Sequence, residues 1–518
     1  MKDKTFQGPL VLIILDGWGI SPNQKGNAIA LAKTPTYNQL LKEYPNSQLV
    51  TCGLQVGLPD GQKGNSEAGH LNLGAGRIAE QDVLVIGRAI SDGTFTKNPA
   101  FVSAIDHVQK HKSQMHLMGL LSGFHSAHVD MTNLYVLLEM MRKKKVEKVF
   151  LHLFTDGRDA PQHDAIKFLR KLREYLSGNQ KIATISGRFY AMDRNKRWPR
   201  TEAAYNALTQ GSGIKVENSE DAILKAYNRG ETDEFIQPSV ILDKGQPTAT
   251  IKNNDSIIFF NLRSDRARQL TKTFVQRDFN RMNSQSFLRQ QFIENLRFVA
   301  MTDFGPELNH ILTAFPSKDF TNTLPLVMKG FKQFYIAETE KYAHVTYFFN
   351  GGFDHPLAGE EWELIPSPNV RSYAEKPEMS AAKVTNAVVL SLEHKAAQFV
   401  VVNFCNPDMI AHTGDLSAAI KAIETCDLAM EKIVKATLKK NGAVIITADH
   451  GNAEEMINLA TSEVDTEHSP YPAPFILVSK QHKNKKLSHG ILADVAPTIL
   501  SIFGVDKPAE MTGNSLIK

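Results

Sequence analysis

The chain has 518 residues, which at roughly 150 residues per domain predicts two to four domains. With 42% hydrophobic and 22% charged residues, the composition is that of a globular protein and excludes a disordered or low-complexity chain. The net charge of +4, from 59 basic and 55 acidic residues, is too small to predict binding to nucleic acid or to a membrane surface.

The first apolar run, Leu10–Leu15, leads directly into Asp16-Gly17-Trp18-Gly19. Because no small-residue cleavage site follows it, the sequence predicts no secretory signal. No apolar run approaches the ~20 residues of a membrane helix. The three cysteines form no disulfide framework and indicate a reducing compartment. We therefore expect a cytoplasmic protein.

Short apolar, β-branched runs recur along the chain, and their length is typical of strands buried on both faces. Between several of them lie helical patterns, of which residues 416–438, capped by Asp415 and closed by Lys439-Lys440-Asn441-Gly442, is the clearest. Alternating strands and helices predict α/β architecture with parallel sheets. The predicted strands are Leu10–Leu15, Val149–Phe154, Ile182–Ile185, Ile257–Phe260, Phe399–Phe404, Val444–Ile446 and Phe475–Val478.

Polar and charged residues follow six of these strands, at the end of a sheet where α/β proteins bind ligands. The arginines among them occupy the middle of the chain, whereas the Asp and His residues lie near its two ends. This separation predicts a domain that is interrupted by a second one. We place the interrupted domain at residues 1–79 and 314–518 and the inserted domain at residues 80–313.

The residues of the interrupted domain are carboxylates and imidazoles, which suit Mn²⁺ or Zn²⁺. Asp408 and His412 are four residues apart and would share one face of a helical turn. Together the set could hold two ions, which in phosphatases clamp the attacking and leaving oxygens. Its members are Asp16, Asp408, His412, Asp449, His450 and His468.

A nucleophile is predicted in the loop Gly61–His70, where Asn65-Ser66-Glu67 could open a helix. Ser66 beside a metal could lose its proton and attack a phosphate, or it could serve only as a helix cap. The loop is one residue too long for the G-x-S-x-G elbow of α/β-hydrolases. A second motif, Gly74–Ala79, matches a dinucleotide fingerprint but follows a poor strand, so we do not expect NAD binding.

The arginines of the inserted domain form pairs suited to a small substrate that carries both a carboxylate and a phosphate. Surface ion pairing with the interleaved aspartates is the alternative. The segments concerned are Asp156-Gly157-Arg158-Asp159, Gly187–Arg194 and Asn261–Arg266, with their cations at Arg158, Arg188, Arg194, Arg263 and Arg266.

Taken together, these segments resemble the cofactor-independent phosphoglycerate mutases of the alkaline phosphatase superfamily, nearly end to end. The strongest matches are Leu15–Gly19, Gly64–His70, Thr155–Asp159, Ser186–Arg194, Glu338–Tyr342 and Thr447–Asn452. The resemblance implies an alkaline-phosphatase-like three-layer α/β sandwich with a second α/β domain inserted. It also implies interconversion of 3- and 2-phosphoglycerate in glycolysis and gluconeogenesis through a phosphoserine, without 2,3-bisphosphoglycerate.

The resemblance further implies two Mn²⁺ ions, with Zn²⁺ or Co²⁺ as substitutes. One ion would be held by Asp408, His412 and His468, and the other by Asp16, Ser66, Asp449 and His450. The glycerate would be bound by His125, Arg158, Asp159, Arg188 and Arg194, while Arg263, Arg266 and Lys341 would neutralise the phosphoryl group. Ser66, Asp159 and Lys341 are the expected catalytic residues, and Asp159 is the candidate for proton transfer.

One segment departs from the family pattern. The chain has Gly123-Phe124-His125-Ser126-Ala127-His128 where the family usually has Gly-Gly-Val-His-Ser-His. His125 matches the local motif, whereas the spacing to Leu134 favours His128. We expect a monomer that acts on a small molecule. Another phosphomutase or a phosphodiesterase of the superfamily, and a non-catalytic metal-dependent anion-binding protein, are the alternative functions.

Overall fold

The structure is a computed structural model of the 518-residue chain. It describes residues 6–123, 126, 128–290, 292–308, 311–316, 320–394 and 396–518. The chain forms two compact units, one of Met1–Gln81 with Lys318–Lys518 and the other of Asp82–Ser317. Each unit has its own hydrophobic core, built around its own sheet.

The first unit contains an eight-stranded sheet. Five neighbouring strands are parallel, from β13 to β15, whereas β16 runs antiparallel to both of its neighbours. The β1 strand is central and fully buried, as its unbroken apolar sequence predicts. In spatial order the strands are β13 (Glu361–Ile365), β12 (Gln333–Glu338), β14 (Phe399–Phe404), β1 (Leu10–Leu15), β15 (Ala443–Thr447), β16 (Ala473–Ser479), β2 (Asn46–Val50) and β17 (Gly490–Ile491).

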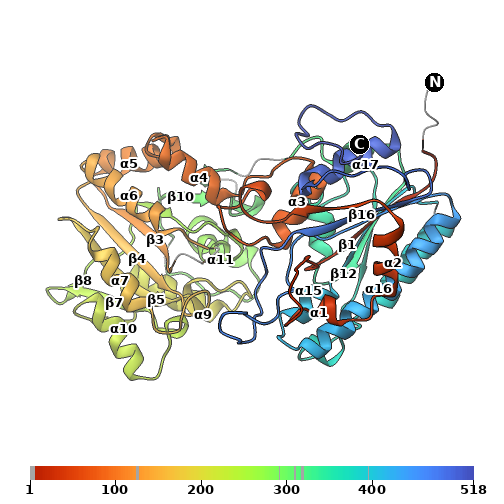
Figure 1. The fold of residues 1–518 in the computed structure, drawn as a ribbon. Coiled ribbons are helices and arrows are strands. Elements are labelled where there is room, and N and C mark those ends of the chain that lie inside the picture. The colour runs from red at the N-terminus through yellow and green to blue at the C-terminus, as the bar shows by residue number, and fades with distance from the viewer. Residues whose placement is uncertain are drawn as a thin grey trace. The chain divides into compact units, whose positions relative to one another are not determined.

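Helices cover both faces of this sheet, with α2 and α16 on one side and α3 and α17 on the other (Figure 1). The longest, α16, begins after Asp415, whose carboxylate accepts a hydrogen bond from the backbone N–H of Ala418. The predicted α/β class and this helix are therefore confirmed. The helices are α1 (Ala28–Leu31), α2 (Pro35–Glu43), α3 (Ser66–Ala75), α13 (Leu324–Val327), α14 (Ala381–His394), α15 (Asn406–Ala411), α16 (Leu416–Lys439) and α17 (Val495–Phe503).

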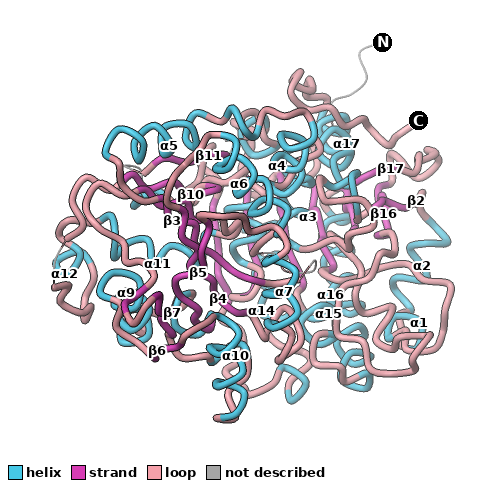
Figure 2. Tube along the Cα trace, turned by 90° about the vertical axis from the view of Figure 1, so that its left-hand side faces the viewer, coloured by secondary structure: helices cyan, strands magenta, loops and turns pink. Residues whose placement is uncertain are grey.

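The second unit contains a nine-stranded sheet, whose central strands lie side by side in Figure 2. Its pairs are parallel from β11 to β5, and β7 runs antiparallel to β5. In spatial order the strands are β11 (Leu312–Phe315), β10 (Arg297–Thr302), β9 (Ser256–Phe259), β3 (Met115–Leu121), β4 (Val149–Thr155), β5 (Gln180–Gly187), β7 (Ser239–Asp243) and β6 (Ile214–Val216), with β8 (Gln246–Pro247) paired to β7.

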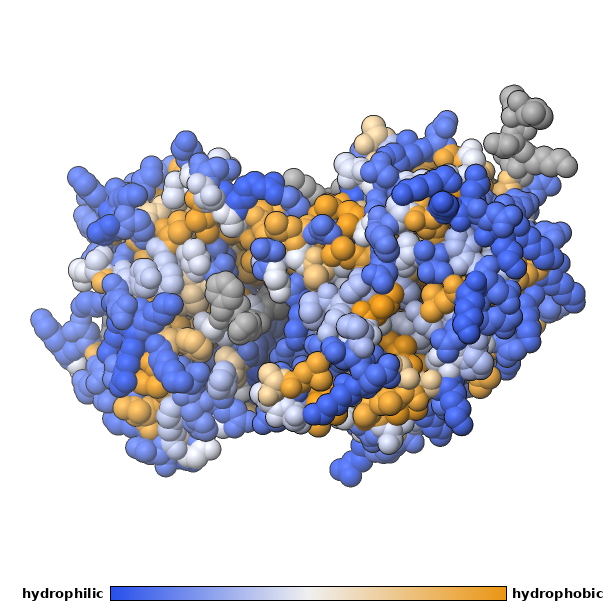
Figure 3. Space-filling view, in the orientation of Figure 1, coloured by the Kyte–Doolittle hydropathy of each residue, from blue (hydrophilic) through white to orange (hydrophobic). Residues whose placement is uncertain are grey.

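The second unit is also rich in helices. They are α4 (Asp82–Ser91), α5 (Pro99–His111), α6 (Met131–Lys143), α7 (Ala165–Arg173), α8 (Arg188–Ala191), α9 (Trp198–Gln210), α10 (Ser219–Asn228), α11 (Ser264–Val275) and α12 (Phe279–Met282). Among the described residues, no helix combines the length and the hydropathy needed to cross a bilayer. On the face shown in Figure 3, hydrophilic residues predominate and apolar ones are scattered.

Candidate metal centre and arginine cluster

Four neighbouring parallel strands of the first unit end at one cluster of charged side chains. Asp16 follows β1, Asp408 lies in the first turn after β14, and Asp449 and His450 follow β15. Lys341 comes from the turn after β12. The three carboxylates are almost completely buried. The carboxyl ends of the parallel strands therefore bring together residues that are hundreds of positions apart in the sequence.

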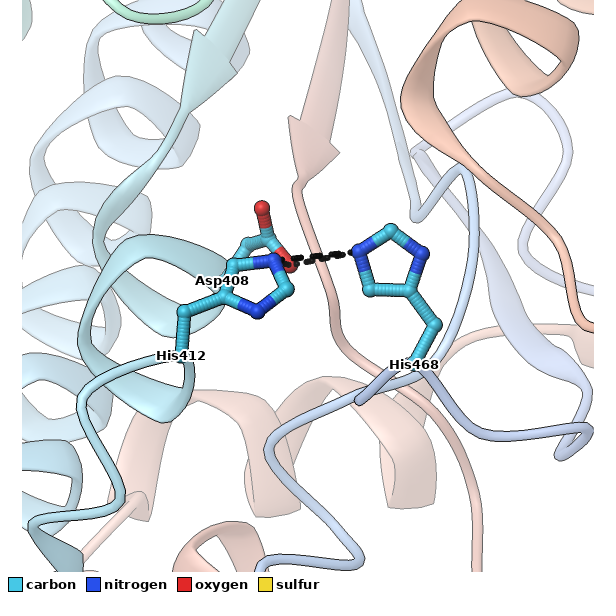
Figure 4. Close-up of side chains that lie close together, drawn as sticks. All are labelled: Asp408, His412 and His468. Atoms are coloured by element: carbon cyan, nitrogen blue, oxygen red, sulfur yellow. Dashed lines mark hydrogen bonds and ion pairs between the residues drawn. The ribbon is translucent and has the colours of Figure 1, made fainter. Parts of the chain in front are cut away.

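Asp408, His412 and His468 converge on one point, as Figure 4 shows. The Nε2 atoms of His412 and His468 lie 3.2 and 3.4 Å from Asp408 Oδ1 and 3.1 Å from each other. Their Nδ1 atoms instead contact backbone carbonyl oxygens, of Thr466 at 2.7 Å and Gly64 at 2.8 Å. Each Nδ1 is thus placed to donate to a carbonyl oxygen, and both Nε2 atoms are directed at Asp408 Oδ1. Two imidazole nitrogens grouped around a carboxylate oxygen are a donor set that fits a metal ion.

A second group surrounds Ser66 at the start of α3. Its Oγ lies 2.9 Å from His450 Nε2 and 3.4 Å from Asp16 Oδ1. His450 Nε2 is also 3.5 Å from Asp449 Oδ2. His450 and Asp16 thus lie against the serine oxygen, and Asp449 lies beside His450. Buried carboxylates, an imidazole and a hydroxyl are the kinds of donor that suit a second oxygen- and nitrogen-ligated cation.

Lys341 supplies the ammonium group in this cluster. Its Nζ lies 2.6 Å from Asp16 Oδ1, 2.6 Å from Ser66 Oγ and 2.7 Å from Asp408 Oδ2. One ammonium cannot balance three buried carboxylates. Burial, and then the nearby Asp449 carboxylate, raise the pKa of Asp16 to about 7 despite the opposing effect of Lys341. The unbalanced negative charge favours divalent cations at this position.

The position of Ser66 depends on two of its neighbours. Asn65, not Ser66, caps α3, because its Oδ1 accepts a hydrogen bond of 2.8 Å from the backbone N–H of Ala68. The alternative that Ser66 is only a cap is therefore wrong. Gly69 allows α3 to approach the β15 loop: a Cβ there would lie 2.7 Å from Asp449 Cβ. The glycines of this segment serve packing, not an α/β-hydrolase elbow.

The segment that resembles a dinucleotide fingerprint lies at the end of the same helix. Gly74 and Ala75 belong to α3, and Gly76 ends it in a left-handed conformation, with φ of +62°. The residues before Gly74 are therefore helical, not a strand. The strand–turn–helix context that a dinucleotide site requires is not met.

In the second unit, Arg188 lies at the centre of the predicted cationic cluster. Its side chain is 1% exposed, and its Nη1 donates to Asp156 Oδ1 at 2.6 Å and to Asp159 Oδ2 at 2.8 Å. Burial disfavours the charge, but these two carboxylates raise the pKa of Arg188 above its ordinary value. For Asp159, burial is outweighed by Arg188, and its pKa is lowered. The carboxylate of Asp159 is thus held ionised.

The other predicted arginines surround this pair. Arg194 Nη1 lies 2.5 Å from Asp265 Oδ2, and Arg263 Nε lies 3.4 Å from Asp265 Oδ1. Arg158 Nη1 lies 3.6 Å from Glu234 Oε1. Burial, and then the positive charges of Arg188, Arg194 and Arg158, lower the pKa of Arg266. The arginines therefore form the ion pairs with aspartates that one alternative expects, and they also lie close enough to repel one another. Their binding of a substrate anion stays a prediction.

His128 belongs to this cluster, whereas His125 lies outside the described residues. His128 Nε2 is 3.9 Å from Asp159 Oδ2, and its Nδ1 is buried without a hydrogen-bond partner. Burial, and then Arg188, lower the pKa of His128 to about 4. His128 thus lies beside Asp159, and which of the two histidines contacts the substrate stays a prediction.

Sequence reasoning missed three polar residues of the metal cluster. Asn452 Nδ2 donates to Asp408 Oδ1 at 2.8 Å. Asn403 Nδ2 donates to Asp16 Oδ2 at 2.7 Å. His70 Nδ1 lies 3.2 Å from Asp449 Oδ2. His70 could have been noticed, because it is four residues from Ser66 and shares its helix face, but Asn403 lies inside a predicted strand and gave no signal.

Comparison with known proteins shows the family of the chain. Residues 8–507 match the family model of the metalloenzyme superfamily. The 2,3-bisphosphoglycerate-independent phosphoglycerate mutases of Clostridium acetobutylicum and Clostridium kluyveri are each 48% identical over 516 residues, covering 98% of this chain and 99% of the relative. A crystal structure of Leishmania mexicana phosphoglycerate mutase at low cobalt concentration superposes with a TM-score of 0.79 at 28% identity, covering 100% of this chain and 99% of the other. The chain therefore belongs to the metalloenzyme superfamily and, within it, to the 2,3-bisphosphoglycerate-independent phosphoglycerate mutases.

Proposed function

We propose that the protein interconverts 3-phosphoglycerate and 2-phosphoglycerate in glycolysis and gluconeogenesis, without 2,3-bisphosphoglycerate. Its relatives are named 2,3-bisphosphoglycerate-independent phosphoglycerate mutases. The observation that carries the proposal is the position of Ser66 Oγ, which lies 2.6 Å from Lys341 Nζ and 2.9 Å from His450 Nε2. A binding protein has no use for a serine hydroxyl held against an ammonium and an imidazole. A phosphoryl-transfer enzyme needs one.

In the proposed reaction, Ser66 Oγ attacks phosphorus in line, and the bond from phosphorus to the glycerate oxygen breaks. A phosphoserine and a glycerate result. The glycerate stays bound, reorients, and attacks the phosphoserine through its other hydroxyl, which regenerates Ser66. Asp159, which is held ionised beside Arg188, is our candidate for carrying the proton between the two glycerate oxygens.

We assign two Mn²⁺ ions to the first unit, one to Asp408, His412 and His468 and one to Asp16, Ser66, Asp449 and His450. When bound, the ions supply positive charge that favours the deprotonated serine and neutralises the phosphate oxygens. Lys341 Nζ, which lies within 2.7 Å of a carboxylate of each ligand set, adds a fixed charge at the same point. The arginines of the second unit would hold the glycerate carboxylate.

The decisive experiment is a coupled assay. The purified protein, loaded with Mn²⁺, is given 3-phosphoglycerate with no bisphosphoglycerate, and formation of 2-phosphoglycerate is followed through added enolase. We expect continuous turnover. Absence of 2-phosphoglycerate would overturn the proposal. Release of inorganic phosphate in its place would indicate a phosphatase.

A further inference from the structure

We propose that His70 and Asn403 are positioning residues that hold Ser66, Asp16 and Asp449 in the geometry needed for the second ion. Neither residue is a ligand in the two assigned sets. The inference rests on the proposed function for the identity of those ligands. It concerns the binding of the ion itself and not the phosphate ester that reacts.

The hydrogen bonds determine where the proton of His70 lies. Asn403 Nδ2 is 2.7 Å from Asp16 Oδ2 and 3.0 Å from His70 Nε2. A carboxylate oxygen accepts, so the Asn403 group that faces Asp16 is its NH₂, and its second hydrogen points to His70 Nε2. Nε2 is therefore the acceptor, and the proton of His70 is on Nδ1.

From Nδ1, His70 contacts the nucleophile's own backbone. Nδ1 lies 2.9 Å from the carbonyl oxygen of Ser66 and 3.2 Å from Asp449 Oδ2. A continuous chain thus runs from Asp16 through Asn403 and His70 to Ser66 and Asp449. It connects both carboxylates assigned to the second ion to the first turn of the helix that carries the serine.

The same proton placement excludes His70 as a metal ligand. His70 lies close enough to Asp16 and Asp449 for the three to form a ligand-like group. However, its Nε2 lone pair is used by Asn403, and its Nδ1 carries a proton. His70 and Asn403 are both 0% exposed, so water cannot replace these bonds. Their role is therefore to fix ligands, not to bind the ion.

The size of the effect follows from other metal sites, where loss of a group that holds a ligand weakens metal binding roughly 10- to 100-fold. The effect should be confined to the second ion. Among the described residues, the side chains of Asp408, His412 and His468 contact one another and have Asn452, Lys341, Thr466 and Gly64 as hydrogen-bond partners, and neither His70 nor Asn403 is among these partners.

Two substitutions of His70 distinguish the roles of its two ring nitrogens. In His70→Asn, the side-chain amide can reach the position of Nδ1 and still donate to the Ser66 carbonyl. In His70→Gln, the amide reaches the position of Nε2, and that donor is lost. The matched control is Asn72→Ala on the same helix, which removes buried hydrogen bonds to the carbonyls of Val56 and Ala68 and touches no ligand.

Co²⁺ binding to the metal-free protein is measured by calorimetry in two backgrounds. His468→Ala disables the first proposed site, and His450→Ala disables the second. In the His468→Ala background we expect His70→Gln to weaken Co²⁺ binding roughly 10- to 100-fold, His70→Asn to recover most of that loss, and Asn72→Ala to bind as the parent does. In the His450→Ala background all variants should bind equally.

Unchanged binding in His70→Gln, equal losses in His70→Asn and His70→Gln, or equal losses in both backgrounds would each overturn the inference. Thermal unfolding of the metal-free forms shows whether each variant folds. If His70→Gln does not, Asn403→Ser, which removes only the amide, must weaken binding roughly tenfold in the His468→Ala background. Because the readout is metal affinity, the outcome is independent of the mutase assay on the unaltered protein.

Discussion

Replacing Arg194 should convert part of the mutase activity into phosphatase activity. In the proposed reaction, the glycerate must stay bound while Ser66 carries the phosphoryl group, because otherwise water attacks the phosphoserine. Arg188 is a poor target for testing this retention, since it is buried and its loss would remove the guanidinium group that both Asp156 and Asp159 contact. Arg194 is 47% exposed and pairs with the partly exposed Asp265, an interaction worth about 0.2–1 kcal/mol. Arg194→Ala should therefore fold.

The expected magnitude follows from the contact that Arg194 would make with the glycerate carboxylate. Hydrogen bonds to charged groups contribute about 1.5–3 kcal/mol, and a guanidinium–carboxylate pair falls in the upper part of this range. A loss of about 2–3 kcal/mol corresponds to roughly 30- to 100-fold faster escape of the glycerate. Turnover to 2-phosphoglycerate should fall, and the ratio of inorganic phosphate to 2-phosphoglycerate should rise.

Both products are measured in one sample at saturating 3-phosphoglycerate with Mn²⁺. The matched control is Arg277→Ala in the same unit, where an exposed arginine pairs with Glu294 and lies outside the cluster. The control should leave the product ratio unchanged. If both products fall in parallel in Arg194→Ala, with the ratio constant, Arg194 does not retain the glycerate and the assigned roles of the arginines are wrong.

Four further outcomes are expected. Ser66→Ala should lower turnover by several orders of magnitude while the protein still binds substrate; retention of a tenth of the activity would exclude Ser66 as the nucleophile. Dialysis against EDTA should abolish activity, and Mn²⁺ should restore it; full turnover after dialysis would contradict the metal assignment. The imidazole of His128 should be neutral at pH 6 by ¹⁵N NMR, because burial and Arg188 lower its pKa to about 4 and a lowered pKa delays protonation; an imidazolium at pH 6 would refute this. Arg188→Ala should reduce the free energy of unfolding by about 3–5 kcal/mol, because it leaves the buried Asp156 without its cation; an unchanged denaturant midpoint would show that the pair adds nothing.

The strands that sequence patterns could predict are those with continuous apolar runs. β1 and β14 begin and end where they were expected. Every residue in the two strands is buried, and all of them except Asn403 are apolar. β3 and β12 were not predicted. In β3 a histidine and a glycine together interrupt the apolar run, and in β12 the two ends, Gln333 and Glu338, are polar, although all of these residues are buried. Burial of polar residues depends on partners elsewhere in the chain, which a local pattern does not contain.

The candidate site was predictable to the extent that its residues follow predicted strands. Asp16, Asp408 and Asp449 were found by that rule, because parallel strands end at one edge of a sheet. Lys341 follows the missed β12 strand, and only the family resemblance indicated it. Asn403 lies within β14, where the rule expects an apolar side chain, so its contact with Asp16 could be seen only in three dimensions.

The segment Gly64–His70 illustrates why a motif can be recognised before its physical basis is known. Its two glycines bracket the serine at a spacing that fits no hydrolase elbow, and the sequence alone offers no reason for them. In the fold, a Cβ at Gly64 would lie 2.1 Å from the carbonyl oxygen of Thr51, and one at Gly69 would lie 2.7 Å from Asp449 Cβ. Both positions therefore need glycine, because the backbone on each side of Ser66 packs directly against Thr51 and Asp449. With Asn65 capping the helix and His70 bonded to the Ser66 carbonyl, the motif fixes the serine from both of its ends.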